Sequence, residues 1–261
     1  GMSYIDLTAT CPFPLSYKRL PLDYLDFNLY GRPEVTYLRD IRLGYAGGEA
    51  VADVDILTGG EGPAEARFNF SLEGADQSRA IGMLTALKEG KAGENFEEVP
   101  TSEDRIDFKL HARGPVEDPL IMGGSGSLNI ENEELYAIQL FGPLSKLLHN
   151  TRLGFTSFAL NQMDANFTIN EGQVEFQNLE INGPRTKIEA PGTLKLEDFS
   201  LAMRVSVYLF GNAGNPDSNI RWISEIITKP IPNLLEFELT GTPDNQKWRS
   251  LYDPRKLIPL L

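Results

Sequence analysis

The sequence predicts a mainly β protein: a large curled antiparallel sheet with about three short α-helices. Two observations carry this prediction. Apolar and polar residues alternate with a period of two along most of the chain, which is typical of strands that cover one face. Short turns such as Gly47-Gly48 and Gly183-Pro184 separate the alternating segments. They favour antiparallel connections, because a parallel crossover needs about a dozen residues or more.

The alternation is clearest in EARFNFSLEG (residues 65–74) and RIDFKLHARG (residues 105–114). Each segment places four apolar residues on one face and charged or polar residues on the other. The apolar residues are Ala66, Phe68, Phe70 and Leu72 in the first, and Ile106, Phe108, Leu110 and Ala112 in the second. Earlier strands are predicted at residues 3–8, 15–18, 23–30, 37–45 and 50–57.

The longest regular stretch is Asp164–Phe210. Its apolar positions change parity between Phe176 and Leu179, which predicts a β-bulge near Gln177-Asn178. A turn is predicted at residues 170–172. Ile188, Leu194 and Leu196 fall in the next strands, and the longest alternating run covers residues 201–209. A last strand is predicted at Leu234–Thr240, before an irregular tail.

The sequence predicts helices in three segments. The first is Asp76–Lys88, with Asp76 as the N-cap. The second, Ala137–His149, has leucines at helical spacing. The third begins at Asn215-Pro216, a cap followed by a proline suited to the first turn, and stops before Pro230. Residues 91–102 are acidic and contain glycine, and we interpret them as a mobile loop.

Three helices cannot cover the apolar faces of about a dozen strands. The sheet must therefore cover itself or hold something apolar, as a trough, an open barrel or a sandwich-like fold. We expect one elongated module over residues 1–261, with weak sub-units at 1–123 and 124–261. A trough would leave a groove lined by apolar side chains.

The composition excludes several classes of function. The charges sum to 24 − 37 = −13, with a pI near 4.7. Nucleic-acid binding and charge-driven docking on anionic membranes both need clustered Lys and Arg, so we expect neither. No apolar run approaches the roughly 20 residues that span a bilayer. Cys11 is the only cysteine, which rules out an intrachain disulfide.

The sequence offers no recognisable catalytic or metal site. His111, His149 and Cys11 stand apart from any partner set, and the glycines at residues 123–126 lack the Lys-Ser/Thr of a phosphate-binding loop. The acidic clusters lack the spacing of a calcium loop. We therefore expect no catalytic residue, no metal and no cofactor. With 37 acidic residues, a hydrolase with an unrecognised acid pair stays open as a third hypothesis.

Several segments, in the same order along the chain, resemble the C-terminal region of AsmA-like proteins, the family that includes TamB relatives. They are the strand Gly126-Ser127-Leu128-x-Ile130, DANFTINEGQVEFQNLEINGP, IEAPGTLKL and the closing ELTGTPDNQKW. Upstream, IRLGYAGGEAVADVDI and GADQSRAIGMLTAL are also similar to family segments. The resemblance covers most of the chain and is strongest over residues 124–248.

The resemblance implies a non-enzymatic module of the bacterial cell envelope that takes part in phospholipid transport or outer-membrane biogenesis. It implies a hydrophobic β groove, with phospholipid or another acyl lipid and other envelope proteins as partners. It also implies a periplasmic location, or a membrane-anchored one facing the periplasm. Gly1-Met2 is typical of a cleaved tag, and whether an N-terminal anchor was removed stays open. Membrane contact is expected only through such an anchor.

The candidate lipid-binding residues lie on the apolar side of the regular stretch. On pattern alone core packing explains them most simply, and lipid lining is the sharper hypothesis. The main alternative is a closed β scaffold that mediates protein–protein interaction through its strand edges. The candidates are Phe167, Ile169, Val174, Phe176, Leu194, Leu196, Met203, Val205 and Val207.

Overall fold

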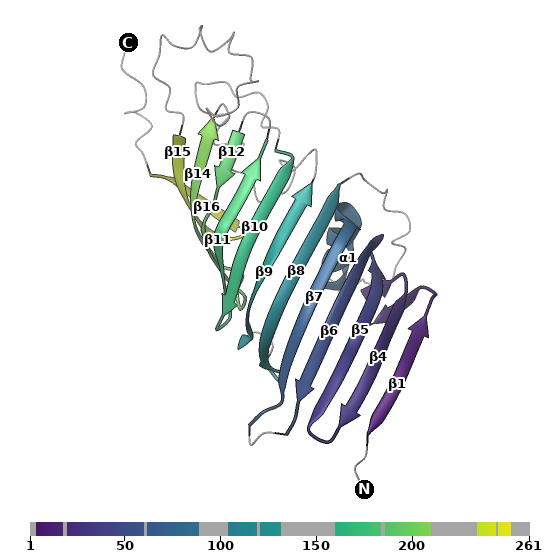
Figure 1. The fold of residues 1–261 in the computed structure, drawn as a ribbon. Helices are drawn as coiled ribbons and strands as arrows, with labels where there is room; N and C mark the ends of the chain where they lie inside the picture. The colour runs from purple at the N-terminus through teal and green to yellow at the C-terminus, as the bar shows by residue number, and fades with distance from the viewer. Residues whose placement is uncertain are drawn as a thin grey trace, which may run out of the picture. The chain divides into compact units, whose positions relative to one another are not determined.

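The computed structural model describes residues 4–17, 20–59, 62–88, 104–118, 121–131, 160–183, 186–209, 234–243 and 245–251. These residues form a mainly β fold with one 14-stranded antiparallel sheet, which is not a closed barrel, and a separate two-stranded sheet (Figure 1). The elements are β1 (Ile5–Cys11), β2 (Leu15–Tyr17), β3 (Leu20–Leu22), β4 (Leu25–Arg32), β5 (Val35–Tyr45), β6 (Gly48–Leu57), β7 (Glu65–Asp76), α1 (Gln77–Lys88), β8 (Arg105–Pro115), β9 (Gly123–Glu131), β10 (Gln162–Asn170), β11 (Gln173–Asn182), β12 (Thr186–Glu189), β13 (Gly192–Lys195), β14 (Leu201–Leu209), β15 (Leu234–Thr242) and β16 (Asn245–Ser250).

The large sheet follows the chain. Its hydrogen-bonded order is β1-β4-β5-β6-β7-β8-β9-β10-β11-β12-β14-β15-β16, with β13 beside β11 and β14. Only the β2–β3 hairpin leaves this path between β1 and β4. Neighbours in space are thus mostly neighbours in sequence, which confirms the antiparallel sheet that the short turns predict. The order of the strands is open, so the sheet is not a closed barrel.

One helix, α1, lies within the described residues, where three were expected. The helices predicted at 137–149 and 215–229, and the loop predicted at 91–102, fall outside the described residues. The first prediction is confirmed in detail. The amide of Arg79 donates a hydrogen bond of 2.9 Å to Oδ1 of Asp76, so Asp76 caps the first turn.

The β10–β11 hairpin confirms the predicted turn. Glu171 and Gly172 both have positive φ, at 47° and 76°, as in a two-residue type I′ turn. In β11 the exposed Gln177 and Asn178 follow each other. The buried positions on either side of them, Val174 and Leu179, differ in parity, as the sequence predicts.

Two strand predictions need correction. The tail after residue 240 was expected to be irregular, but residues 245–250 form β16, paired with β15 from Phe237↔Ser250 to Thr242↔Asn245. Trp248 is the only apolar residue in β16, so the strand carries no alternating pattern. Leu196, expected in a strand, lies in the turn after β13.

The chain packs as two compact units. Unit 1 comprises residues 1–132 and 164–174, and its described part contains β1 to β9, α1 and most of β10. Unit 2 comprises residues 133–163 and 175–261, and its described part contains most of β11 and the strands that follow it.

Candidate functional site

One face of unit 1 is apolar across its whole width. Antiparallel register aligns every second residue of successive strands into cross-strand rows, so alternation in each strand becomes a continuous surface. We call the surface formed by these rows the unit 1 apolar face. One row is Leu7, Leu29, Leu38, Val54, Phe68 and Ala112; the next includes Ile41, Ala52, Phe70 and Leu110; a third is Leu25, Leu43, Ala50, Leu72, Phe108 and Leu128.

Helix α1 and the β2–β3 hairpin cover one end of this face. Met83 and Ala80 of α1 and Leu22 of β3 pack against Leu72 and Ala50 in a buried cluster. In Figure 1, α1 lies behind the strands β6 and β7. Its contacts with Leu72 and Ala50 place it on their apolar side. This end of the face is therefore an ordinary hydrophobic core.

A hydrogen bond ties α1 to the sheet inside this core. The hydroxyl of Tyr45, which is 8% exposed, donates to the carbonyl of Ala80 at 3.1 Å. Burial raises the pKa of Tyr45 to about 12, because the phenolate would lose its hydration. The buried hydroxyl is thus partnered and neutral at physiological pH.

The rest of the face is only half-buried. Among the described elements, the packing of α1 and the β2–β3 hairpin reaches the rows around Leu43, Phe70 and Phe108. Beyond these rows Ala66 and Ala112 are buried, but the larger apolar side chains of β1 and β4 to β8 keep partial exposure. On β1 exposure reaches 60% for Ile5 and 49% for Leu7. The half-buried residues are Leu29, Leu38, Val54, Ile56, Phe68 and Leu110.

A glycine in β9 makes room for an aromatic ring on the part of the face that β8, β9 and β10 form. A Cβ on Gly126 would lie 2.4 Å from Cζ of Phe167, so only glycine leaves room for that ring on β9. The Phe167 ring stacks on Phe108 with centroids 6.0 Å apart and planes at 19°. The candidate Phe167 therefore belongs to the unit 1 apolar face, where it is 7% exposed.

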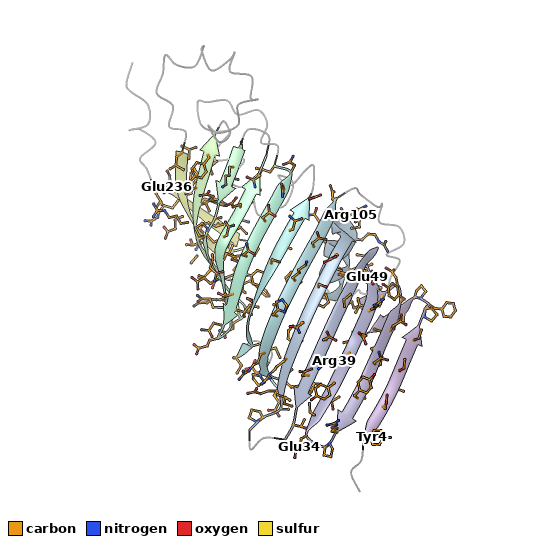
Figure 2. All side chains as sticks on the ribbon, viewed as in Figure 1. Tyr4, Glu34, Arg39, Glu49, Arg105 and Glu236 are labelled. Carbon is orange, nitrogen blue, oxygen red and sulfur yellow. The ribbon has the colours of Figure 1, made fainter. Side chains whose placement is uncertain are left out.

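The opposite face of unit 1 is polar and ion-paired. Arg39, labelled in Figure 2, forms an ion pair of 2.5 Å with Asp55 of the neighbouring strand. The hydrogen bond to Asp55 raises the pKa of Arg39. Lys109 pairs with Glu73 at 3.2 Å across β7 and β8. These partly exposed pairs favour a hydrated surface and contribute little to stability.

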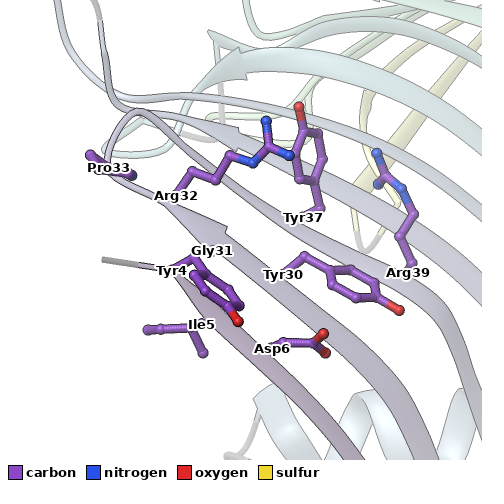
Figure 3. A pocket seen from close by; sticks show the side chains of 9 residues that line it. All are labelled: Tyr4, Ile5, Asp6, Tyr30, Gly31, Arg32, Pro33, Tyr37 and Arg39. Carbon is purple, nitrogen blue, oxygen red and sulfur yellow. The ribbon is translucent and has the colours of Figure 1, made fainter. Parts of the chain in front are cut away.

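A cavity of about 820 Å³ opens beside β1, β4 and β5 (Figure 3). Three tyrosines, Tyr4, Tyr30 and Tyr37, line it together with Arg32 and Arg39. The guanidinium of Arg39 lies 4.8 Å from the centroid of the Tyr37 ring. The lining contains one carboxylate, Asp6, and neither histidine nor cysteine, so it holds no acid–base pair of carboxylates.

The structure places most candidate lipid-binding residues in packed interiors. Val205 and Val207 of β14 are 1% and 0% exposed and lie opposite Phe237 and Leu235 of β15. A side chain with so little accessible surface has little to offer a ligand. Phe167, Val174 and Met203 are also buried, and Ile169, Phe176, Leu194 and Leu196 are half-buried. Phe167, Ile169 and Val174 belong to unit 1 and the other six to unit 2.

The sequence did not predict which part of the apolar surface stays accessible. The alternation in residues 65–74 and 105–114 identifies the apolar side of β7 and β8. It does not reveal which rows α1 and the β2–β3 hairpin cover, because those contacts join distant segments. One feature of the sequence could have indicated unit 1. Residues 20–57 contain predicted strands and no predicted helix that could cover them.

His111 and Cys11, the histidine and cysteine within the described residues, each contact a single neighbour rather than a set of catalytic partners. Nδ1 of His111 lies 2.8 Å from Oδ1 of Asn69 on the polar face, and Sγ of Cys11 lies 3.6 Å from the carbonyl of Phe13. No group of three or more His, Cys, Asp or Glu in this part of the chain could hold a metal ion. His149 lies outside the described residues. None of the helices in the described part is long and apolar enough to cross a membrane.

Comparison with known proteins gives no relative: no protein-family model, no curated protein and no solved structure matches this chain.

Proposed function

We propose that the chain is a non-enzymatic lipid-handling module that holds acyl chains of phospholipid against the half-buried part of the unit 1 apolar face. The observation that carries the proposal is the continuity of apolar side chains across β1 and β4 to β8, beyond the rows covered by α1. The setting, a bacterial cell envelope with a role in phospholipid transport or outer-membrane biogenesis, comes from the sequence resemblance.

The chemistry of the face favours a hydrocarbon chain over a polar ligand. Val54, Phe68 and Leu38 lie opposite one another in one row, and none can form a hydrogen bond. A peptide or sugar laid on such a surface would bury its polar groups without partners, at a cost of about 1–3 kcal/mol for each group. An acyl chain has none, and each buried methylene contributes about 0.8 kcal/mol.

The charge on the chain supports contact with acyl chains rather than with anionic headgroups. A net charge of −13 repels an anionic membrane surface, so attraction must come from the apolar part of the lipid. The hydrolase hypothesis stays a prediction; Glu180 and Glu189 both pair with Lys187, at 3.0 and 2.9 Å. Turnover in a screen of glycan and ester substrates would support it.

Two valines of β6 form a matched pair that tests the proposal. Val54 is half-buried on the unit 1 apolar face, and Val51, 40% exposed, belongs to the opposite face of the same strand. Val54→Thr keeps the side-chain shape and adds one hydroxyl. We expect it to weaken binding of the apolar dye Nile red about tenfold, the equivalent of about 1.4 kcal/mol. Val51→Thr should leave dye binding unchanged.

Circular dichroism checks that both variants keep the β-sheet spectrum of the parent. Dye binding that is equal in both variants, or that is absent from the parent chain, would contradict the proposal. Competition by phosphatidylethanolamine, which should displace the dye, distinguishes a lipid surface from a site that takes any apolar aromatic compound.

A further inference from the structure

Strand β1 ends the hydrogen-bonded order of the large sheet and has one strand partner among the described residues, β4. The two pair residue for residue from Ile5↔Gly31 to Cys11↔Leu25, without a bulge. In such a pair, alternate residues direct their N–H and C=O groups away from the partner strand. Seven consecutive residues without proline, lysine or arginine therefore offer a template for one more strand.

The strand at the other end of the order carries two basic side chains, whereas the one charged side chain of β1 is Asp6. β16 contains Lys247 and Arg249, and Arg249, which is 72% exposed, pairs with Glu238. Charged side chains on an edge strand oppose pairing with another chain, because addition of a strand would desolvate them. On β1 the exposed side chains include Ile5 and Leu7, at 60% and 49%.

We propose that β1 pairs antiparallel with β1 of a second copy of this chain, centred on Thr8. This register uses all seven residues of the strand. It sets Leu7 opposite Ala9 of the second copy, Ile5 opposite Cys11, and Asp6 opposite Thr10, so apolar residues meet apolar ones and the two carboxylates stay apart. A pairing centred on Asp6 would set the carboxylates face to face, and one centred between residues would set apolar side chains opposite polar ones.

The two-fold axis of this pairing stands perpendicular to the sheet, so the apolar faces of both copies lie on the same side. The interface itself consists of backbone hydrogen bonds and short side-chain pairs. It does not depend on the proposed lipid function, and a variant that abolishes pairing leaves Val54 and its row intact. A single strand pair is small for an interface, so we expect a reversible dimer.

A charge swap at Thr8 tests the register. Thr8 is exposed and donates a hydrogen bond of 2.9 Å to Oδ1 of Asn28, so its replacement leaves the packed interior untouched. In the proposed dimer the two Thr8 side chains face each other. Thr8→Lys alone and Thr8→Glu alone should each abolish the dimer by like-charge repulsion, and an equimolar mixture should restore it. Val51→Lys, which adds a charge in the interior strand β6, is the control and should dimerise like the parent chain.

Sedimentation equilibrium of the full chain up to about 100 μM, a range that populates weak interfaces, gives the readout. The parent should reach the mass of two chains, and each single variant that of one chain, 29.0 kDa. A parent chain that stays monomeric overturns the proposal, even if it binds an extended strand of another protein. Dimers that persist in both Thr8 variants also overturn it, and so does a mixture that stays monomeric.

Discussion

At the covered end of the unit 1 apolar face, burial changes the pKa of a single side chain, that of Tyr45. Its ring packs in the cluster formed with α1, and its hydroxyl donates to the carbonyl of Ala80. Burial raises the pKa of Tyr45 to about 12, against 10.0 for a free tyrosine. The neutral phenol is therefore favoured by the folded state, and its contribution is complete below pH 10.

We expect the free energy of unfolding to fall as pH rises from 10 to 12, because the unfolded chain loses the Tyr45 proton at a lower pH than the folded chain does. Tyr45→Phe should reduce this loss by on the order of 1 kcal/mol, a value discounted for solvent screening. Urea unfolding of both proteins at pH 9 and at higher pH values measures the difference. Identical pH dependence in the two proteins would show that Tyr45 titrates as a solvated group.

Phe167 shows the limit of sequence reasoning for a single residue. The alternating pattern predicts that it lies on an apolar face, and it does. Its position over β9 depends on Gly126, whose missing side chain makes room for the ring. The local pattern around Phe167 does not indicate a glycine 41 residues earlier in the chain, so the stacking on Phe108 could not be predicted.

Helix α1 is the element that closes part of the unit 1 apolar face, and its first turn depends on a cap. Asp76 accepts the hydrogen bond from the Arg79 amide, and its own amide donates to the carbonyl of Ala46 at 2.9 Å. The side-chain bond satisfies one of the amides that a helix start leaves without an intrahelical partner.

We expect Asp76→Ala to lower the free energy of unfolding by about 1 kcal/mol, within a usual range of about 0.5–2 kcal/mol for lost caps. Asp76→Asn keeps an acceptor in the same place and should cost much less. Urea unfolding followed by circular dichroism compares the two variants with the parent chain. Equal losses in both would indicate that the carboxylate charge, rather than the cap, stabilises the helix.

Whole elements were predictable where local patterns determine them. The Glu171-Gly172 turn and the change of parity after Phe176 follow from residue types and spacing. β16 was not predictable, because its single apolar residue, Trp248, carries no alternation. It exists through its ladder with β15 and the edge contact of the Trp248 ring with Phe237, at 6.1 Å between centroids. Such contacts are tertiary and leave no local signal.

At the scale of the whole molecule, the two units use the same alternation differently. In unit 2 every second residue from Leu201 to Val207 and from Leu235 to Leu239 is almost completely buried, from 0% for Val207 to 7% for Leu235. In unit 1 the rows beyond α1 keep half-buried apolar side chains. An alternating strand predicts that one face is apolar, but whether that face becomes a core depends on what packs against it. For this reason the candidate lipid-binding residues on β14 of unit 2 are buried, whereas the apolar surface of unit 1 stays partly accessible.

The most direct test of the lipid proposal maps where an acyl chain lies on the protein. Phosphatidylethanolamine with a photoreactive diazirine in one acyl chain would be bound, irradiated and located by mass spectrometry of the digested chain. The proposal predicts crosslinks in peptides that contain Val54, Phe68 and Leu110, and their loss in a Val54→Asp variant, with Val51→Asp as the control. Crosslinks confined to the strands of unit 2, or spread equally over both faces of β6, would contradict it.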